Sequence, residues 1–427
     1  MSPARETSGP RGRRRTALGI LLFALVAALV AGVSGCSPSG ADKGSGTSKQ
    51  SAAGDDPAGV AGGKAAAGRQ LLQKGGGGSG LYPRAIRLQH SGKDNGRVLA
   101  STVTFDGDNG LGAIHESTDG GRSFQQVGKI ADPAASKGKG QCCGTLYELP
   151  RQIGDMKAGT LLWAASPGQD EKGRRMSVRV FKSTDTGRNW SYLSTVAKAD
   201  NDKGLWEPEF SVDAQGRLVA HYSDETDPAH SQKLMAARST DGKKWTGHHA
   251  TVSSTNKPDR PGMAGVRRLP DGTYFMVYEI CAPSGKFACV VHYRTSKDGW
   301  DWGDPKDLGT RPETADGHYF AHAPTVSWAP EPGNPKGKLM LIGQVEYAKD
   351  GQRTPGARSA MWTNSDNGKG AWKPAKAPVS ITSDKIDFCP NYSSTLLPGK
   401  DGKNVTEIAT DYEGKTCKPY AATGPAH

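Results

Sequence analysis

Aromatic residues are scarce in this sequence, and long apolar runs are almost absent. Aromatics make up 7% of the 427 residues, and the one long uncharged, mostly apolar run spans residues 17–33. No glycine-rich phosphate loop, zinc-ligand spacing or dinucleotide-binding fingerprint occurs. Long helical periodicity is also missing, whereas short β-rich runs bounded by polar turns recur along the chain. We therefore expect an all-β protein that uses neither a cofactor nor a metal.

The first 36 residues have the layout of an export signal. Five arginines at positions 5–15 precede the apolar run, which closes on Val33-Ser34-Gly35-Cys36. A secretory signal has this three-part order, and its end resembles the lipobox of bacterial lipoproteins, in which the cysteine carries the lipid. The alternative is a transmembrane anchor, for which about 17 apolar residues is the short limit. We expect a signal peptide over 1–36 and an exported protein, anchored through Cys36 to the outer face of the bacterial cytoplasmic membrane or released.

Residues 37–79 have a composition that disfavours folding. They are mainly Gly, Ala, Ser, Lys and Asp, and they end in four consecutive glycines before Ser79. Such a segment cannot bury enough apolar surface to offset the entropy of ordering it, so we expect a flexible tether. The net charge of +12 comes from scattered rather than clustered residues, which argues against a nucleic-acid partner. The folded domain is expected over residues 80–427, as a monomer.

Without Cys36, six cysteines remain in the exported part of the chain: Cys142, Cys143, Cys281, Cys289, Cys389 and Cys417. Disulfides persist in an oxidising compartment, and six cysteines allow 15 pairings. Proximity in the sequence favours Cys281–Cys289 and Cys389–Cys417. The remaining adjacent pair is either a vicinal disulfide or two buried thiols, since adjacent Cα atoms lie only about 3.8 Å apart, below the usual disulfide span.

A turn motif with the pattern Ser-x-Asp-x-Gly-x-x-Trp/Phe recurs along the chain. Full copies span residues 117–124 and 183–190, shorter copies span 239–245 and 296–302, and a degenerate copy lies at 363–372. The Ser and Asp side chains bond the backbone of a tight turn, and glycine takes the positive φ. The four good copies are 56–66 residues apart, a period typical of repeat architectures, and they resemble the Asp boxes of β-propellers.

A second series consists of six β-rich hairpins. Their first strands contain equivalent positions that are 53–66 residues apart, at Pro83, Cys143, Pro208, Pro261, Pro324 and Pro390. Six hairpins combined with the turn motifs give six blades of four strands each. Because a sixth turn motif is missing, we expect residues near the N-terminus to complete the last blade. The predicted fold is an all-β, six-bladed propeller.

Candidate site residues follow from this topology. If each innermost strand begins at one end of the propeller, its hairpin partner ends there, and the turn motifs lie at the opposite end as scaffold. The expected site is lined by carboxylates, aromatic rings and arginines, which suit a sugar: Tyr82, Arg84, Trp206, Glu207, Glu209, Arg260, His322 and Tyr392 from first strands, and Asp224, Tyr278 and Glu279 from second strands.

Glu207 and Glu279 are the strongest candidates for catalysis. Glu207 opens an innermost strand, and Glu279 closes the second strand of the following blade, so both are expected at the same end near the axis. Paired carboxyl groups perform glycoside hydrolysis. An ion pair with Arg260 is the structural alternative for Glu207. Glu209, two residues along the same strand, is the main competitor.

The motifs QCCGTLYEL, GLWEPEF, YSDE, RPGM, LPDGTYFMVYE and CPNYSS, in this order over roughly residues 80–420, resemble the exo-α-L-arabinanases. These are retaining glycosidases on a six-bladed, sialidase-like propeller. The resemblance implies that Glu207 and Glu279 are the catalytic pair, which we assign as nucleophile and acid/base, and that Tyr392 is the tyrosine beside it. It implies release of arabinobiose from the non-reducing end of α-1,5-linked arabinan, without a metal.

A sialidase and a non-catalytic glycan-binding protein are the alternatives. Sialidases hold the sialate carboxylate with three arginines, the first usually two residues before a proline in the first innermost strand. Here Leu81 occupies that position and Arg84 follows Pro83, which counts against a sialidase, although Arg84 and Arg260 could substitute. The propeller scaffold by itself warrants no activity.

Overall fold

The computed structural model describes residues 69–72, 78–282 and 288–427. The predicted signal peptide, Cys36 and most of the predicted tether lie outside the described residues. Within the described part, no helix is long and apolar enough to cross a membrane, and the only helices are two 3-10 turns, Gly92–Asp94 and Pro133–Ala135. The prediction of an all-β protein is confirmed.

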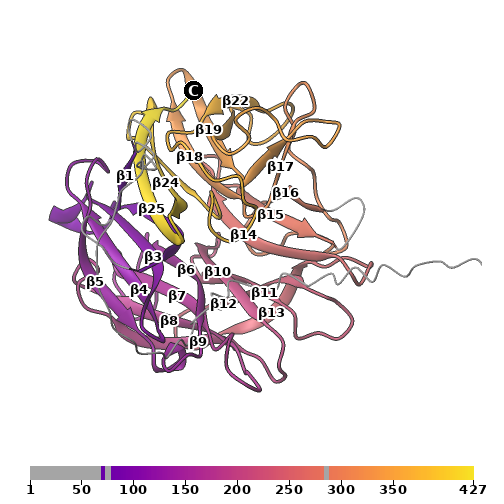
Figure 1. Ribbon diagram of the computed structural model, residues 1–427. Coiled ribbons are helices and arrows are strands. Elements are labelled where there is room, and N and C mark those ends of the chain that lie inside the picture. The colour runs from indigo at the N-terminus through magenta and orange to yellow at the C-terminus, as the bar shows by residue number, and fades with distance from the viewer. Residues whose placement is uncertain (1–68, 73–77, 283–287) are drawn as a thin grey trace, which may run out of the picture. The chain divides into compact units, whose positions relative to one another are not determined.

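The described strands form six antiparallel sheets, three of them in the first half of the chain (Figure 1). The first contains β2 (Gly80–Arg87), β3 (Val98–Asp106), β4 (Asn109–Ser117) and β5 (Gln125–Ala131). The second contains β6 (Gln141–Glu148), β7 (Leu161–Pro167), β8 (Ser177–Ser183) and β9 (Ser191–Lys198). The third contains β10 (Leu205–Val212), β11 (Leu218–Asp224), β12 (Lys233–Ser239) and β13 (Thr246–Val252).

The other three sheets follow in the second half. The fourth has five strands, β14 (Arg260–Arg268), β15 (Tyr274–Cys281), β16 (Ala288–Ser296), β17 (Tyr319–Ala321) and β20 (Val345–Tyr347). The fifth contains β18 (Thr325–Glu331), β19 (Asn334–Ile342), β21 (Ala360–Asn364) and β22 (Lys373–Lys376). The sixth contains β23 (Thr395–Pro398), β24 (Asn404–Glu413), β25 (Thr416–Pro425) and β1 (Gln70–Leu71).

The first strands of the six sheets contact one another in cyclic order. β2 contacts β6, β6 contacts β10, and the series continues through β14, β18 and β23 back to β2. Residues from the middle or second half of each of these strands line one cavity, so the innermost strands run in the same direction. We call the end where they begin the start end, and the opposite end the turn end. Apolar side chains fill the space between neighbouring sheets, as Trp163 does between the first two.

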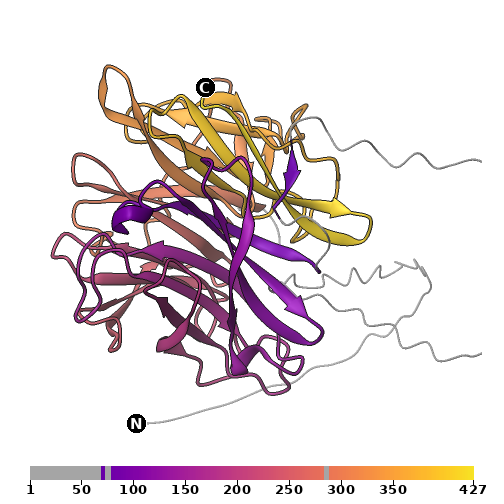
Figure 2. The ribbon, with the colours of Figure 1, turned by 90° about the vertical axis from the view of Figure 1, so that its left-hand side faces the viewer.

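The last sheet is completed by residues from the beginning of the described chain. Gln70 and Leu71 pair with Ala421 and Tyr420 of β25, and the short indigo strand lies against the yellow sheet in Figure 2. Arg69 bonds the Asp411 carboxylate at 2.6 Å. These N-terminal residues belong to the segment expected to be a tether, so that part of it is in the fold, where it supplies the expected closing strand.

The innermost strands share a bulge close to their start. In β2, β6, β10 and β14 the pairing register shifts at the same place, and the bulged residues Tyr82, Cys143, Glu207 and Met263 have φ between 51° and 66°. Bulges bend a strand and re-aim its side chains. A left-handed conformation costs a non-glycine residue roughly 1–2 kcal/mol, and such strain concentrates at functional sites. The bulges therefore mark the start end.

The four good Ser-x-Asp motifs form equivalent turns at the turn end. In the turn after β4, the Ser117 hydroxyl donates to the Asp119 carboxylate at 2.7 Å and accepts the Gly121 N–H at 2.8 Å. The same serine contacts recur in the turns that begin at Ser183, Ser239 and Ser296. These bonds satisfy the polar groups of each turn internally, as expected for turns with a structural role.

Three disulfides join the six cysteines of the described residues. Cys281 bonds Cys289 and Cys389 bonds Cys417, as proximity in the sequence indicated. Cys142 and Cys143 are also joined, so the vicinal disulfide rather than the pair of free thiols is correct.

Candidate active site

Glu207 lies at the bulge of β10, where its φ is 58°. Its Oε2 accepts the Ser223 hydroxyl at 2.6 Å and the Met263 backbone N–H at 2.9 Å. Gly262 makes the approach of the next sheet possible, because a Cβ there would lie 2.4 Å from Gln232 Nε2 and 3.3 Å from Glu207 Oε2. Two donors from two sheets thus fix one carboxylate oxygen.

Burial and hydrogen bonding act in opposite directions on Glu207. Removal from water raises the pKa of the Glu207 carboxyl, and the bonds from Ser223 and Met263 and the positive charge of Arg260 partly offset this rise. Donors favour the ionised form of a carboxyl group. Hydroxyl and backbone donors therefore hold this carboxyl group, and no ion pair within 4 Å does so among the described residues.

Glu279 lies at the same end, on β15, directly opposite Gly262 in the pairing of β14 and β15. Its side chain is 8% exposed, and its Oε2 accepts the Ala323 backbone N–H at 2.7 Å. Burial, followed by the negative charge of Glu207, raises the pKa of Glu279 to about 8. A buried carboxyl group that stays protonated at neutral pH beside a second carboxyl group is typical of a general acid in an active site.

Tyr392 lies beside this pair. Its hydroxyl donates to the Sδ atom of Met263 at 3.5 Å, and Met263 is the residue whose N–H holds Glu207. Tyr392 packs against a buried cluster that includes Met263, Tyr82, Trp206 and the vicinal pair of cysteines. The structure therefore brings the three predicted catalytic residues together.

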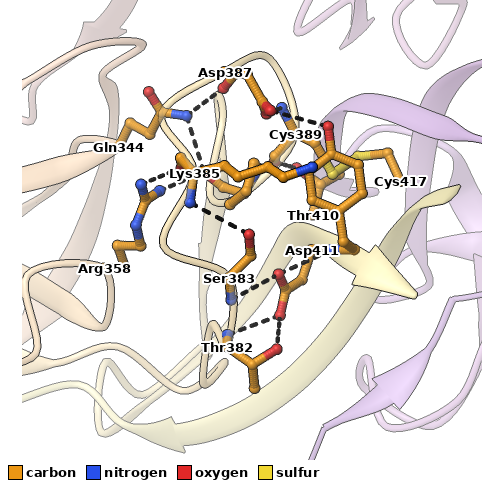
Figure 3. The surroundings of a disulfide bond; sticks show 12 residues. Gln344, Arg358, Thr382, Ser383, Lys385, Asp387, Cys389, Thr410, Asp411 and Cys417 are labelled. Carbon is orange, nitrogen blue, oxygen red and sulfur yellow. Dashed lines mark hydrogen bonds between the residues drawn. A yellow bond between two sulfur atoms is a disulfide. The ribbon is translucent and has the colours of Figure 1, made fainter. Parts of the chain in front are cut away.

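The segment that leads into Tyr392 is tied down from three directions (Figure 3). The Cys389–Cys417 disulfide joins it to β25. The Asp411 carboxylate accepts the backbone N–H and hydroxyl of Thr382 at 2.8 Å each. The side chains of Gln344 and Arg358 donate to backbone carbonyl oxygens, those of Asp384, Lys385, Asp387 and Pro390. These bonds hold in place the segment that carries Tyr392.

Arg260 is held by its own acidic partner, not by Glu207. Its guanidinium pairs with Glu225, bonds Gln232 Oε1 at 2.8 Å and donates to the Ser231 carbonyl at 3.1 Å. The predicted alternative, an ion pair between Glu207 and Arg260, is therefore wrong. The charge of Arg260 still acts on both catalytic candidates, lowering the pKa values of Glu207 and Glu279.

Trp206 and Asp224 lie beside the site, and contacts with neighbouring residues restrict the movement of both side chains. Trp206 is 3% exposed, with the Arg174 guanidinium 5.4 Å from its ring centroid. Asp224 Oδ1 accepts the Thr226 N–H at 2.7 Å and the Thr226 hydroxyl at 2.6 Å, so this carboxylate fixes a turn.

Three residues predicted to contact substrate lie elsewhere. Tyr278 is fully buried and donates to the Leu308 carbonyl at 2.8 Å, because successive residues of a strand point to opposite faces. Glu209 pairs with Arg267 at 2.7 Å in a cavity at the turn end. Arg84 lines that same cavity and donates to the Ser393 hydroxyl at 2.8 Å. The expectation that Glu209 shares the side of Glu207 is wrong, because the bulge changes the alternation.

His322 lies next to Glu279. One donor atom from each of these residues and the two sulfurs of Cys281 and Cys289 are within 4.8 Å of one another. Because the sulfurs are joined in a disulfide, they are not the thiolates that a metal site uses. Burial, with a contribution from Arg358, lowers the pKa of His322 to about 4, so this imidazole is neutral beside the carboxyl group.

Three contributors to the site were not selected from the sequence. Ser223 lies in the motif YSDE and Met263 in RPGM, so both motifs were noted while the residues that bond Glu207 were not. Ala323 follows His322 and gives the backbone N–H that holds Glu279. Backbone donors carry no residue-type signal, which is why the sequence did not point to Met263 and Ala323.

No protein-family model and no curated protein matches the sequence. Solved structures do. The α-L-arabinofuranosidase of Fusarium graminearum, solved with arabinobiose, is 26% identical, with a TM-score of 0.66 over 81% of this chain and 93% of that one. The Penicillium chrysogenum α-L-arabinanase complexed with arabinobiose is 23% identical, with a TM-score of 0.65 over 82% of this chain and 94% of that one.

A more distant likeness is to the NanB sialidase of Streptococcus pneumoniae. It is 12% identical, with a TM-score of 0.52 over 83% of this chain and 70% of that one, which shows a shared fold alone. The structural neighbours are thus glycoside hydrolases, and their similarity to this chain supports a glycosidase.

Proposed function

We propose that this protein is an exo-acting, retaining glycosidase that cleaves α-1,5-linked arabinan from the non-reducing end. The observation that carries the proposal is the pairing of the half-buried Glu207 with the buried Glu279, which is protonated at neutral pH. The 26% identity to an arabinofuranosidase solved with arabinobiose supports the sugar class. In this proposal the six sheets are the blades of a six-bladed propeller, and the Ser-x-Asp turns are its Asp boxes.

In the first step, a Glu207 carboxylate oxygen attacks the anomeric carbon of the sugar. The bond from that carbon to the leaving oxygen breaks, and Glu279 gives its proton to the leaving oxygen. The pKa of about 8 of Glu279 keeps it protonated at neutral pH, as a general acid requires. Ser223 and Met263 already bond the second oxygen of Glu207, so the attacking oxygen is held in a fixed direction.

In the second step, Glu279, now ionised, removes a proton from water, and the resulting oxygen attacks the same carbon. The covalent bond to Glu207 breaks, and the sugar leaves with its original anomeric configuration. Once the charge of Glu207 is lost in the covalent intermediate, the pKa of Glu279 falls, because that charge is one of the causes of its rise. The fall lets Glu279 change from acid to base between the steps.

The arginines favour arabinan over a sialoside. Arg260 is committed to Glu225, and Arg84 to Ser393 and the ring of Tyr82. Neither guanidinium is free to clamp a substrate carboxylate, which a sialidase requires. A neutral sugar needs no such clamp.

The proposal extends to the location of the protein. The predicted signal and Cys36 would place it, as a monomer, on the outer face of the bacterial cytoplasmic membrane by a lipid anchor. Mass spectrometry of the protein recovered from bacterial membranes would test this, with an acylated N-terminal Cys36 expected and an unmodified Cys36→Ser variant released from the membrane.

The activity is tested by incubating the purified protein with debranched arabinan and resolving the products by size. Arabinobiose with retained anomeric configuration at the first time points is expected. A fluorogenic sialoside is the comparison substrate. No release from arabinan would contradict the proposal, and turnover of the sialoside alone would favour a sialidase. Binding of arabino-oligosaccharides without turnover would favour a glycan-binding protein.

A further inference from the structure

A cavity lies at the turn end of the innermost strands, away from Glu207 and Glu279. It has a volume of about 780 Å³, and all six innermost strands contribute to its wall with residues from their middle or second half. Glu207 lies near the start of β10 and Glu279 near the end of β15, both at the start end. The cavity is therefore a separate feature from the candidate active site, on the same axis.

The acidic side chains of this cavity already have their partners. Glu209 is paired with Arg267 at 2.7 Å. Glu148 accepts three hydrogen bonds of 2.7–2.9 Å from residues 89–91. Asp213 is paired with the arginine four residues along the chain at 2.7 Å. None of these three carboxylates is left to neutralise another cation.

Three arginines in the same wall have no such partner. Arg87, Arg151 and Arg268 form no ion pair within 4 Å among the residues that the structure describes. The Nε atom of Arg87 is buried without a hydrogen-bond partner, and burial lowers the pKa of Arg87. Its Nη1 atom donates to the Gly96 carbonyl at 3.3 Å, so the half-buried Arg87 is partly satisfied. Arg151 and Arg268 are exposed, and the Arg268 guanidinium lies 5.9 Å from the centroid of the Tyr274 ring. The three side chains add positive charge to the wall that no carboxylate within 4 Å offsets in the described residues.

The wall also offers some aromatic surface. Tyr147 and Trp328, which are both partly exposed, line the cavity together with the arginines. Arginine forks bind carboxylate and phosphate groups in two-point geometry, and rings beside them provide a surface for the body of a ligand. A sugar chain that carries acidic groups combines these two properties.

A hollow next to the cavity extends the basic surface. It has a volume of about 810 Å³, lies between the first two sheets, and shares His90 with the cavity. Lys93, Lys157 and Lys182 line it and form no ion pair within 4 Å in the described part of the chain. Three aspartates line it as well, but Asp94 pairs with Arg97, Asp155 pairs with Lys243, and Asp185 accepts bonds within its own turn. The basic residues thus extend over a longer surface than a single acidic group would cover. This favours a ligand chain that carries several acidic groups.

We propose that the cavity at the turn end, together with the adjoining hollow, binds an anionic oligosaccharide that carries carboxylate or phosphate groups. Because the two sites lie at opposite ends of the sheets, one protein could hold an acidic polymer while the catalytic end acts on a neutral chain. Such a second contact raises the effective concentration of a linked substrate.

Isothermal titration of the full-length protein with three probes tests this proposal. An oligogalacturonate supplies carboxylates, an oligomer of glycerol phosphate supplies phosphodiesters, and a neutral arabino-oligosaccharide is the control. We expect one of the anionic probes to bind with an affinity that falls as ionic strength rises, and the probe that binds identifies the source of the charge. Binding that the neutral oligosaccharide displaces would place the ligand at the catalytic end and overturn the proposal, as would the absence of binding by both anions.

The matched variants are Arg151→Ala/Arg268→Ala and Arg175→Ala. Arg175 is an exposed arginine of the second sheet that donates only to backbone carbonyls, in the loop after β7 at the start end. We expect the double variant to weaken binding of the anionic probe at least about tenfold, with hydrolysis of a short neutral substrate unchanged. Arg175→Ala should bind as the wild type does. Equal affinities in all three proteins would overturn the proposal, and thermal unfolding of each confirms that the variants fold.

Discussion

Acidic side chains at the two ends of the innermost strands have different bonding partners. At the start end, Glu207 and Glu279 are held by hydroxyl and backbone donors, without an ion pair within 4 Å in the described residues. At the turn end, Glu209 pairs directly with Arg267, and Asp119, Asp185, Asp241 and Asp298 are satisfied by their own turns. Burial outweighs the few donors of Glu207 and Glu279 and raises the pKa values of both. Several hydroxyl and backbone donors lower the pKa values of the four turn aspartates instead.

The largest difference between the ends should appear in variants of the acidic residues. Glu207→Gln and Glu279→Gln should each lower kcat/KM on arabinan by about 10²–10⁴-fold, because nucleophilic or acid/base catalysis is lost. Glu209→Gln, two residues from Glu207 but at the turn end, should keep kcat within a few-fold and lose stability instead. Steady-state kinetics and thermal unfolding measure both. Equal losses for Glu207→Gln and Glu209→Gln would remove the distinction between the ends.

A smaller loss is expected when the approach to Glu207 is crowded. Gly262→Ala places a Cβ 2.4 Å from Gln232 Nε2 and 3.3 Å from Glu207 Oε2, so the carboxylate must shift, at a cost of about 10- to 100-fold in kcat. Gly265→Ala on the same strand is the control, because its Cβ would meet Val277 at an ordinary 3.4 Å. Comparable kcat values in the two variants would contradict the placement of Glu207.

The pH dependence of kcat/KM tests the same end more finely. Its basic limb should lie at about pH 8, where Glu279 loses its proton. Ser223→Ala removes a bond that favours ionised Glu207, so the pKa of Glu207 rises and the acidic limb moves to higher pH, with roughly tenfold lower activity on that limb. Ser211→Ala, which removes a bond to His221 in the same sheet, should leave both limbs in place. An acidic limb unmoved by Ser223→Ala would exclude this role of Ser223.

The smallest effect on catalysis is expected at the turn end. Asp185→Ala removes acceptors for the backbone N–H groups of Arg188 and Asn189 at 3.2 and 2.9 Å. We expect the free energy of unfolding to fall by about 1–2 kcal/mol with kcat unchanged, measured by denaturant titration and by kinetics below the unfolding transition. A loss of kcat in the folded variant would show that this end takes part in the reaction.

The sequence predicted well the features that depend on local chemistry. The Ser-x-Asp motifs form the expected turns because a serine and an aspartate satisfy the backbone within a few residues. The pairings Cys281–Cys289 and Cys389–Cys417 follow from closeness along the chain. Glu207 and Glu279 were identified because each sits at the end of an apolar strand, where the hairpin order alone places them at one end of the sheets.

The sequence could not predict which way the side chains point beyond the bulges. Simple alternation puts Glu209 on the same side as Glu207, but the bulge at Glu207 inserts a residue and sends Glu209 to the other cavity. The proline positions also misaligned the strands, since the bulged residue equivalent to Glu207 is Met263, two residues after Pro261. A bulge depends on pairing with the next strand, which residue types do not reveal.

By itself, the sequence determined an all-β repeat of turns and hairpins and the two glutamates at its strand ends, since these follow from short-range spacing. Only the tertiary structure decided the surroundings of those glutamates. Their donors come from Ser223, Met263 and Ala323 on separate segments, and the charge of Glu207 acts on Glu279 across two sheets. The sequence indicated that N-terminal residues close the last sheet, but only the structure identified these residues as Gln70 and Leu71. A protonation state depends on burial and neighbouring charge, and both exist only once distant strands have come together.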